Sequence, residues 1–154
     1  MKSLVSIIVL VAVIRQIPHD LEIYFVDVGQ GDCTLIVTPN DKTILIDGGG
    51  SPTYNVGKNT LIPYLLDRKI KELDYIIVSH FDEDHVGGIL NVLKELEVNQ
   101  VIINKQPENS ENYLKFLDIV KQKKKGAVCI GCSMAGTSSR VSPRKISTPS
   151  FRRR

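Results

Sequence analysis

The stretch IIVSHFDEDHVGGI, Ile76–Ile89, joins an apolar run to a polar motif and then to a glycine pair. The polar motif spans His80–His85 and holds two of the chain's three histidines together with three carboxylates. Carboxylates this close repel one another unless a positive charge lies between them. The motif is therefore either a solvated acidic surface loop or a site for a cation.

The surroundings of the motif favour the cation site. The apolar run 73–79 predicts a buried strand, and 86–97 predicts a helix. Functional groups of α/β proteins gather where strands end. A second apolar run, 43–46, ends at Asp47 and continues into three glycines, so Asp47 is expected near the same edge of the sheet.

The spacing H-x-D-x-D-H permits two ligand pairs. His80 and Asp82 lie two residues apart and can point the same way from an extended loop. Asp84 and His85 are adjacent at the start of a helix. Each pair offers one imidazole and one carboxylate to a divalent cation. Two cations about 3.5–4 Å apart would hold a bridging water and lower its pKa to about 7.

The other apolar runs complete an α/β pattern. Short strands separated by turns predict an antiparallel meander, followed by helices that alternate with strands. Asn59 and Ser110 are expected to cap the first and third helices, and Pro63 is compatible only with a helix start. The expected strands are 21–28, 33–38, 43–46, 73–79 and 100–104, and the expected helices are 59–70, 86–97 and 110–125.

The charge of the chain divides near Lys125. A length of 154 residues suits one domain, and the formal net charge is +3. Residues 1–125 hold 14 Lys and Arg against all 17 Asp and Glu, net −3, whereas 126–154 hold 6 Lys and Arg and no acid, net +6. We therefore expect a domain over 21–125 and a basic, Ser/Arg-rich tail over 126–154. The three cysteines are an odd number and predict no disulfide framework.

Residues 1–16 have the pattern of a signal peptide or a short membrane anchor. Lys2 precedes 11 mostly apolar residues, 4–14. The run is shorter than the roughly 20 residues of a membrane span, and no small-residue cleavage site follows it. A buried strand is the alternative, because Val and Ile dominate. The favoured expectation is an extracytoplasmic or membrane-associated protein.

Three motifs together resemble the opening half of the metallo-beta-lactamase superfamily. They are YFVDVGQGDCTLI (24–36), TILIDGGG (43–50) and IIVSHFDEDHVGGI (76–89), in this order. More narrowly, they are similar to the branch related to the metallo-hydrolase domain of the competence protein ComEC. In that branch the second histidine of H-x-H-x-D-H is an aspartate, here Asp82. The resemblance covers roughly residues 21–125.

The resemblance implies an αββα sandwich with a dinuclear metal centre, of which this chain would form the N-terminal half. His80 and Asp82 would bind one metal, and Asp84 and His85 the other. Asp84 would also steady the attacking hydroxide, and Asp47 would support the site from the strand end. The implied reaction is hydrolysis of a phosphodiester such as DNA, with zinc or manganese as the two metals.

The chain departs from the family pattern after these motifs. The family uses two later histidines and a bridging aspartate, but no histidine follows His85 and no acidic residue follows Asp118. Four ligands are few for two metals, because catalytic zinc alone keeps three. We expect a truncated domain whose tail is out of frame after the lysine-rich segment 121–125. A genuine basic arm that binds nucleic acid or an anionic membrane is the alternative.

Three functions stay open on this sequence. The first is a metal-dependent phosphodiesterase or nuclease, the second a non-catalytic remnant that binds at most one metal weakly, and the third a basic-tailed protein that binds nucleic acid or membranes. No protein partner is indicated. Half of a sandwich would leave an apolar sheet face uncovered, so we also expect marginal stability.

Overall fold

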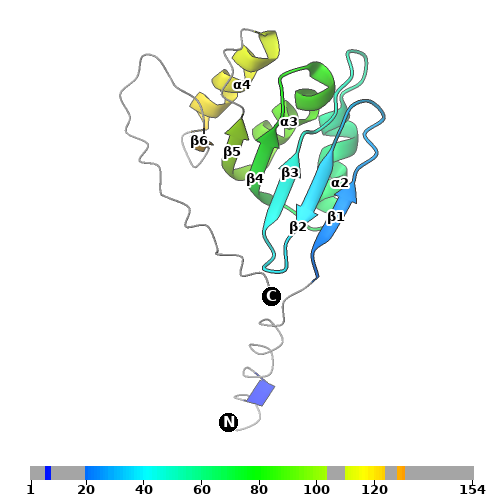
Figure 1. Cartoon of the computed structure of the whole chain (residues 1–154), viewed down its shortest axis with the longest axis vertical. Coiled ribbons are helices and arrows are strands. Elements are labelled where there is room, and N and C mark those ends of the chain that lie inside the picture. The colour runs from blue at the N-terminus through cyan, green and yellow to red at the C-terminus, as the bar shows by residue number, and fades with distance from the viewer. Residues whose placement is uncertain (1–5, 8–19, 104–109, 124–127, 131–154) are drawn as a thin grey trace, which may run out of the picture.

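A computed structural model describes residues 6–7, 20–103, 110–123 and 128–130. Within them, six strands form one sheet in the order β1-β2-β3-β4-β5-β6, which is also their order along the chain (Figure 1). The first three strands are antiparallel, and β4, β5 and β6 continue parallel to β3. The strands are β1 (Glu22–Phe25), β2 (Thr34–Val37), β3 (Thr43–Ile46), β4 (Glu72–Val78), β5 (Glu97–Ile103) and β6 (Val128–Ile130).

The parallel strands are joined by helical crossovers, as parallel pairing requires. A π-helical turn η1 (Gly57–Leu61) leads into α2 (Ile62–Asp67) between β3 and β4, and α3 (Glu83–Glu95) joins β4 to β5. The last helix, α4 (Glu111–Gln122), lies between β5 and β6 in the chain. This topology places the carboxyl ends of β3 and β4 side by side, as the sequence predicts for Asp47 and the histidine motif.

One face of the sheet is covered by helices. Side chains of Leu35, Leu45, Ile76 and Val101 lie in one row across β2, β3, β4 and β5, and all four are completely buried. In Figure 1, α2 and α3 lie behind the sheet, and α4 packs against α3. A mostly aliphatic core therefore lies between the sheet and this helical layer.

The opposite face of the sheet is also apolar but is not fully buried. Ile36, Ile44 and Tyr75 form a row on this face and are each partly exposed. Phe25, at the edge strand, is 85% exposed. No helix among the described residues lies over this face in Figure 1. The arrangement is the one-sided layer that half of a sandwich would form.

The first helical segment begins earlier than its sequence pattern indicates. Helical structure begins at Val56, one residue before η1, so the prediction that Asn59 caps this helix is wrong. Asn55 has that role instead, because its side-chain oxygen accepts the Lys58 backbone N–H at 2.9 Å. Pro63 is the second residue of α2, in the first turn of that helix, which agrees with its expected place near a helix start.

Further boundaries differ from expectation, since β1 ends at Phe25 instead of residue 28 and β5 begins at Glu97 instead of residue 100. Helix α3 starts at Glu83 instead of residue 86, because the acidic residues of the motif themselves form its first turn. The sequence indicates neither helix nor strand after residue 125, whereas Val128–Ile130 pair with β5. Three residues are too few for a strand period to be recognised in the sequence. The predicted Ser110 cap is confirmed, since its hydroxyl accepts the Tyr113 N–H at 3.2 Å.

Among the described residues, no helix is long and apolar enough to cross a membrane. Apart from residues 6–7, the predicted signal or anchor over 1–16 lies outside the described part of the chain. The same holds for the basic tail over 126–154 apart from β6. Both remain predictions.

Candidate metal centre

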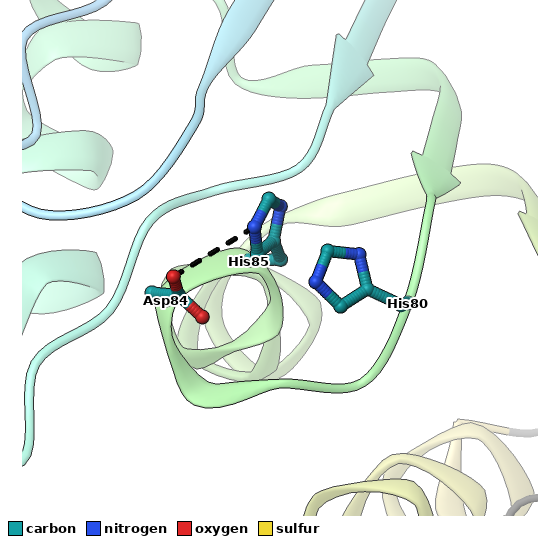
Figure 2. A group of neighbouring side chains, drawn as sticks. All are labelled: His80, Asp84 and His85. Atoms are coloured by element: carbon teal, nitrogen blue, oxygen red, sulfur yellow. Dashed lines mark ion pairs between the residues drawn. The ribbon is translucent and has the colours of Figure 1, made fainter.

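The histidine motif lies where β4 gives way to α3. His80 lies on the short loop after β4, and Asp84 and His85 lie in the first turn of α3 (Figure 2). One potential ligand atom from each of these three side chains lies within 4.8 Å of the others. The centroids of the two imidazole rings are 3.7 Å apart. The structure thus brings together three of the four side chains predicted as metal ligands.

Each imidazole has a carboxylate on its Nε2 side. His80 Nε2 lies 3.5 Å from Asp82 Oδ2, and His85 Nε2 lies 3.8 Å from Asp84 Oδ2. These are the same two pairs that the sequence spacing suggests. The Asp82 side chain is 78% exposed and stands outside the convergent group of three. It is the N-cap residue of α3, but it makes no side-chain capping bond, so its carboxylate is not used by the helix.

The Nδ1 side of both rings is held by the protein. Asp47 is 5% exposed, and its Oδ2 lies 3.1 Å from His85 Nδ1. The same oxygen accepts the Ser79 hydroxyl at 2.6 Å, and Ser79 Oγ in turn lies 2.8 Å from His80 Nδ1. Asp47 Oδ1 accepts the backbone N–H of Ser79 at 2.9 Å. A single buried carboxylate therefore orients both imidazoles, one directly and one through a hydroxyl.

Asp47 reaches this position because the chain turns sharply after β3. Its backbone is left-handed, with φ of 53°, a conformation that Asp and Asn tolerate better than other non-glycine residues. Its N–H still donates to the carbonyl of Ile77 at 2.9 Å, so the residue stays attached to β4. The strand end thus fixes the carboxylate beneath the histidine loop.

Two glycine loops hold the first turn of α3. A Cβ atom at Gly31 would overlap the backbone carbonyl of Asp84, and one at Gly50 would overlap that of Glu83. Backbone bonds complete the contact, since Gly48 N–H donates to the His85 carbonyl at 2.8 Å. The glycines of the motifs GQGD and GGG therefore allow two loops to touch the backbone that carries the ligands.

Cys33 lies near this centre but is not a ligand candidate. Burial, and to a smaller extent the Asp47 carboxylate, raise the pKa of its thiol to about 12. Thiolates, not thiols, bind metals and attack substrates, so Cys33 is inert at neutral pH.

The donor set suits a divalent metal ion. Imidazole nitrogen and carboxylate oxygen are the ligands that zinc and manganese take in proteins. Imidazoles that bind metal present one nitrogen to the ion and donate the other N–H to a carboxylate or another acceptor. His80 and His85 are both held in this way, with Nε2 on the side of the exposed carboxylates. The residues therefore fit the metals that the resemblance implies.

Sequence reasoning missed Ser79 and the loop contacts. The sequence pattern predicts Ser79 only as the last residue of a strand, although a hydroxyl beside the first histidine of a ligand motif is the available signal. The roles of Gly31 and Gly50 could not be assigned, because their contacts are with α3, more than 30 residues away in the chain.

Comparison with known proteins decides the family. The sequence model of the metallo-beta-lactamase superfamily matches residues 26–147. The chain belongs to this superfamily. The match confirms the predicted resemblance, and it continues beyond residue 125, where the proposed domain boundary lies.

The curated relatives of this member of the metallo-beta-lactamase superfamily support the narrower branch. ComE operon protein 3 of Bacillus subtilis (strain 168) is 34% identical over 97 residues, covering 54% of this chain and 12% of that protein. Recombination protein 2 of Haemophilus influenzae (strain ATCC 51907 / DSM 11121 / KW20 / Rd) is 40% identical over 91 residues, covering 58% and 11%. An uncharacterised protein, YcaI, of Escherichia coli (strain K12) is 35% identical over 77 residues, covering 49% and 10%. The chain spans about a tenth of the length of these relatives.

Proposed function

We propose that this chain carries the metal-binding half of a phosphodiester hydrolase, with DNA as the substrate. The observation that supports the proposal most directly is the arrangement of the two imidazoles. Both present Nε2 towards a carboxylate, while Asp47 and Ser79 occupy Nδ1. Such an arrangement places Nε2 of each ring on the side of the carboxylates, where a metal ion would be bound.

A bound divalent metal would supply an ionised water at neutral pH and would polarise a phosphoryl oxygen. The residues of the chain have the remaining tasks. His80 and His85 hold their nitrogens in place, and the Asp84 carboxylate is 42% exposed beside them. Asp84 is therefore both a proposed ligand and the proposed group that orients the attacking hydroxide. The mixed nitrogen and oxygen set suits zinc and manganese.

The substrate and the location rest on the relatives and on the sequence. One relative is named as a recombination protein and another as a product of the ComE operon, and recombination is a process of DNA. We extend this to the present chain as a DNA phosphodiester substrate. Residues 1–16 support an extracytoplasmic or membrane-associated location, with the apolar run 4–14 as the segment that would enter the membrane.

A second candidate is a protein that binds one metal ion without turnover. It is favoured by the fact that three side chains converge into one group, while Asp82 is largely exposed outside it. Catalytic zinc sites keep three protein ligands, and His80, Asp84 and His85 supply that number for one ion.

Metal content and turnover together test both candidates. The full chain is loaded with Zn²⁺ or Mn²⁺, its bound metal is measured, and its hydrolysis of bis(p-nitrophenyl) phosphate and of single-stranded DNA is followed. A hydrolase shows metal-dependent turnover that falls at least about 100-fold in Asp84→Asn. Asp67→Asn, an exposed carboxylate of α2, serves as the matched control and keeps full activity. One bound equivalent without turnover identifies the second candidate, and no bound metal contradicts both.

A further inference from the structure

The hydrogen bonds around Asp47 have a defined direction. A carboxylate can only accept, so the Ser79 hydroxyl must donate its single proton to Asp47 Oδ2, 2.6 Å away. The hydroxyl then has no proton left for its second partner. Ser79 Oγ therefore accepts, and His80 Nδ1, at 2.8 Å, must carry the proton that is donated.

The same direction applies to the second imidazole without an intermediary. His85 Nδ1 lies 3.1 Å from Asp47 Oδ2, which again can only accept. Both rings are therefore protonated on Nδ1, and in the neutral form of each ring the lone pair is then on Nε2. The tautomer of a histidine ligand is set by the hydrogen bond that its other nitrogen makes.

We propose that Ser79 is a positioning residue for His80. Its hydroxyl donates to Asp47 and therefore accepts from His80 Nδ1, which fixes the tautomer of that ligand. The inference rests on the proposed metal centre for its purpose, but the hydrogen-bond relay itself needs no metal. Ser79 is well placed for this role because its backbone N–H is also bound to Asp47, at 2.9 Å. The backbone and the hydroxyl of Ser79 thus bind the two oxygens of one carboxylate.

The geometry also separates Ser79 from the chemistry itself. Its hydroxyl proton is directed at a carboxylate on the Nδ1 side of the rings, away from Asp82 and Asp84 on the Nε2 side. The hydroxyl is thus neither a ligand candidate nor a nucleophile. Its effect passes through His80, which distinguishes it from the residues proposed to touch metal or substrate.

The test is long-range ¹H–¹⁵N NMR of the metal-free full chain, which reports the protonated nitrogen of each histidine. Wild type should show Nδ1–H for both His80 and His85. In Ser79→Ala only His80 should shift towards the Nε2–H form, while His85 keeps its direct bond to Asp47. Ser79→Thr retains a hydroxyl and should restore the wild-type pattern. Ser51→Ala removes a hydroxyl from a different loop and should change neither ring.

Zinc binding is measured in the same variants by calorimetry. Loss of an acceptor behind a ligand typically weakens binding about 10- to 100-fold, and we expect this for Ser79→Ala but not for Ser79→Thr. Three results overturn the relay: an Nε2–H form of His80 in wild type, an unchanged His80 in Ser79→Ala, or equal changes at both rings. If wild type shows both Nδ1–H tautomers yet binds no metal, the relay stands and the proposed function fails.

Discussion

Two carboxylates, Asp47 and Asp74, join β3 to β4 at opposite ends of the strands, and they do so with nearly the same set of bonds. Asp47 accepts the backbone N–H and the hydroxyl of Ser79 at 2.9 and 2.6 Å. Asp74 accepts the backbone N–H and the hydroxyl of Thr43 at 3.0 and 3.3 Å. The difference lies in the third partner, which is His85 for Asp47 and the Lys42 ammonium, at 2.6 Å, for Asp74.

The third partner decides whether such a carboxylate is structural or functional. Lys42 satisfies Asp74 as a simple ion pair beside an open hollow of about 670 Å³. His85 has a second nitrogen, so the same type of contact at the other end holds a group that can bind something else. The carboxyl end is also closely packed against glycine loops. Comparable bonds therefore serve strand pairing at one end and a candidate metal centre at the other.

The largest effect should come from disturbing the close packing at the carboxyl end. Gly31→Ala would force a methyl group against the Asp84 carbonyl, in a backbone with φ of +85°. We expect a loss of about 3 kcal/mol or more of unfolding free energy, measured by urea denaturation followed by circular dichroism. Total domain stability is about 5–15 kcal/mol, so the variant is expected to be close to unfolding.

Gly29→Ala is the matched control for this packing. Gly29 has a similar φ of +79°, but no neighbouring atom lies within 4 Å of the added Cβ. The control therefore has only the left-handed backbone cost of about 1–2 kcal/mol. Equal losses in the two variants would show that backbone conformation, and not contact with α3, makes Gly31 necessary.

The second prediction concerns a variant that reverses the direction of the hydrogen bonds around residue 47, at the carboxyl ends of β3 and β4. In Asp47→Asn the amide oxygen is expected to stay with the Ser79 N–H, which leaves the amide NH₂ facing the Ser79 hydroxyl and His85. An NH₂ donates, so both imidazoles should change to the Nε2–H tautomer and lose their exposed lone pairs. Zinc affinity should fall about 10- to 100-fold. Asn also accepts the left-handed backbone at this position.

Asp74→Asn is the counterpart of this exchange at the other end. It alters a carboxylate that joins the same two strands but contacts no imidazole. The zinc affinity and histidine tautomers of this variant should therefore equal those of wild type. A weakened zinc site in Asp74→Asn would mean that the two ends are coupled through the sheet and that the contrast between them is wrong.

The fold of this region could be predicted well where local pattern and burial agree. The run 43–46 matches β3 residue for residue, and the buried run after residue 73 matches β4, because apolar β-branched segments between turns have few other solutions. The strand-end rule then placed Asp47 beside the histidine motif correctly. The Ser110 cap followed from the same local chemistry.

What could not be predicted depends on contacts between distant segments. The sequence places Asp47 at a strand end, but its left-handed φ and its shared bond to Ser79 and His85 exist only once β3 and β4 are paired. The start of the first helix was misplaced for a related reason, since Asn55 and Asn59 are equally plausible caps by residue type. Only the folded chain selects between them.

The third prediction concerns stability at the amino end. Asp74→Asn removes the ion pair with Lys42 while it keeps an acceptor for Thr43. Because Lys42 is largely exposed, the expected loss is only about 1 kcal/mol of unfolding free energy, measured by urea denaturation at neutral pH. High salt should reduce the difference between variant and wild type. A salt-independent difference would assign the loss to the Thr43 contacts instead.

The smallest expected effect is the change with pH in the stability that the Lys42–Asp74 ion pair contributes. Burial alone would raise the pKa of Asp74, but the bonds from Lys42 and Thr43 outweigh it and hold the pKa below its ordinary value of 3.8. A carboxyl group with a lowered folded pKa contributes stability above its unfolded pKa, and this contribution disappears as the pH falls through the folded value. The difference in unfolding free energy between wild type and Asp74→Asn should therefore be constant between about pH 5 and 7, which is roughly one pH unit or more above 3.8. The difference should shrink once the pH falls below 3.8. A difference that stays constant down to about pH 2 would show that the ionised form of Asp74 is not what joins the two strands.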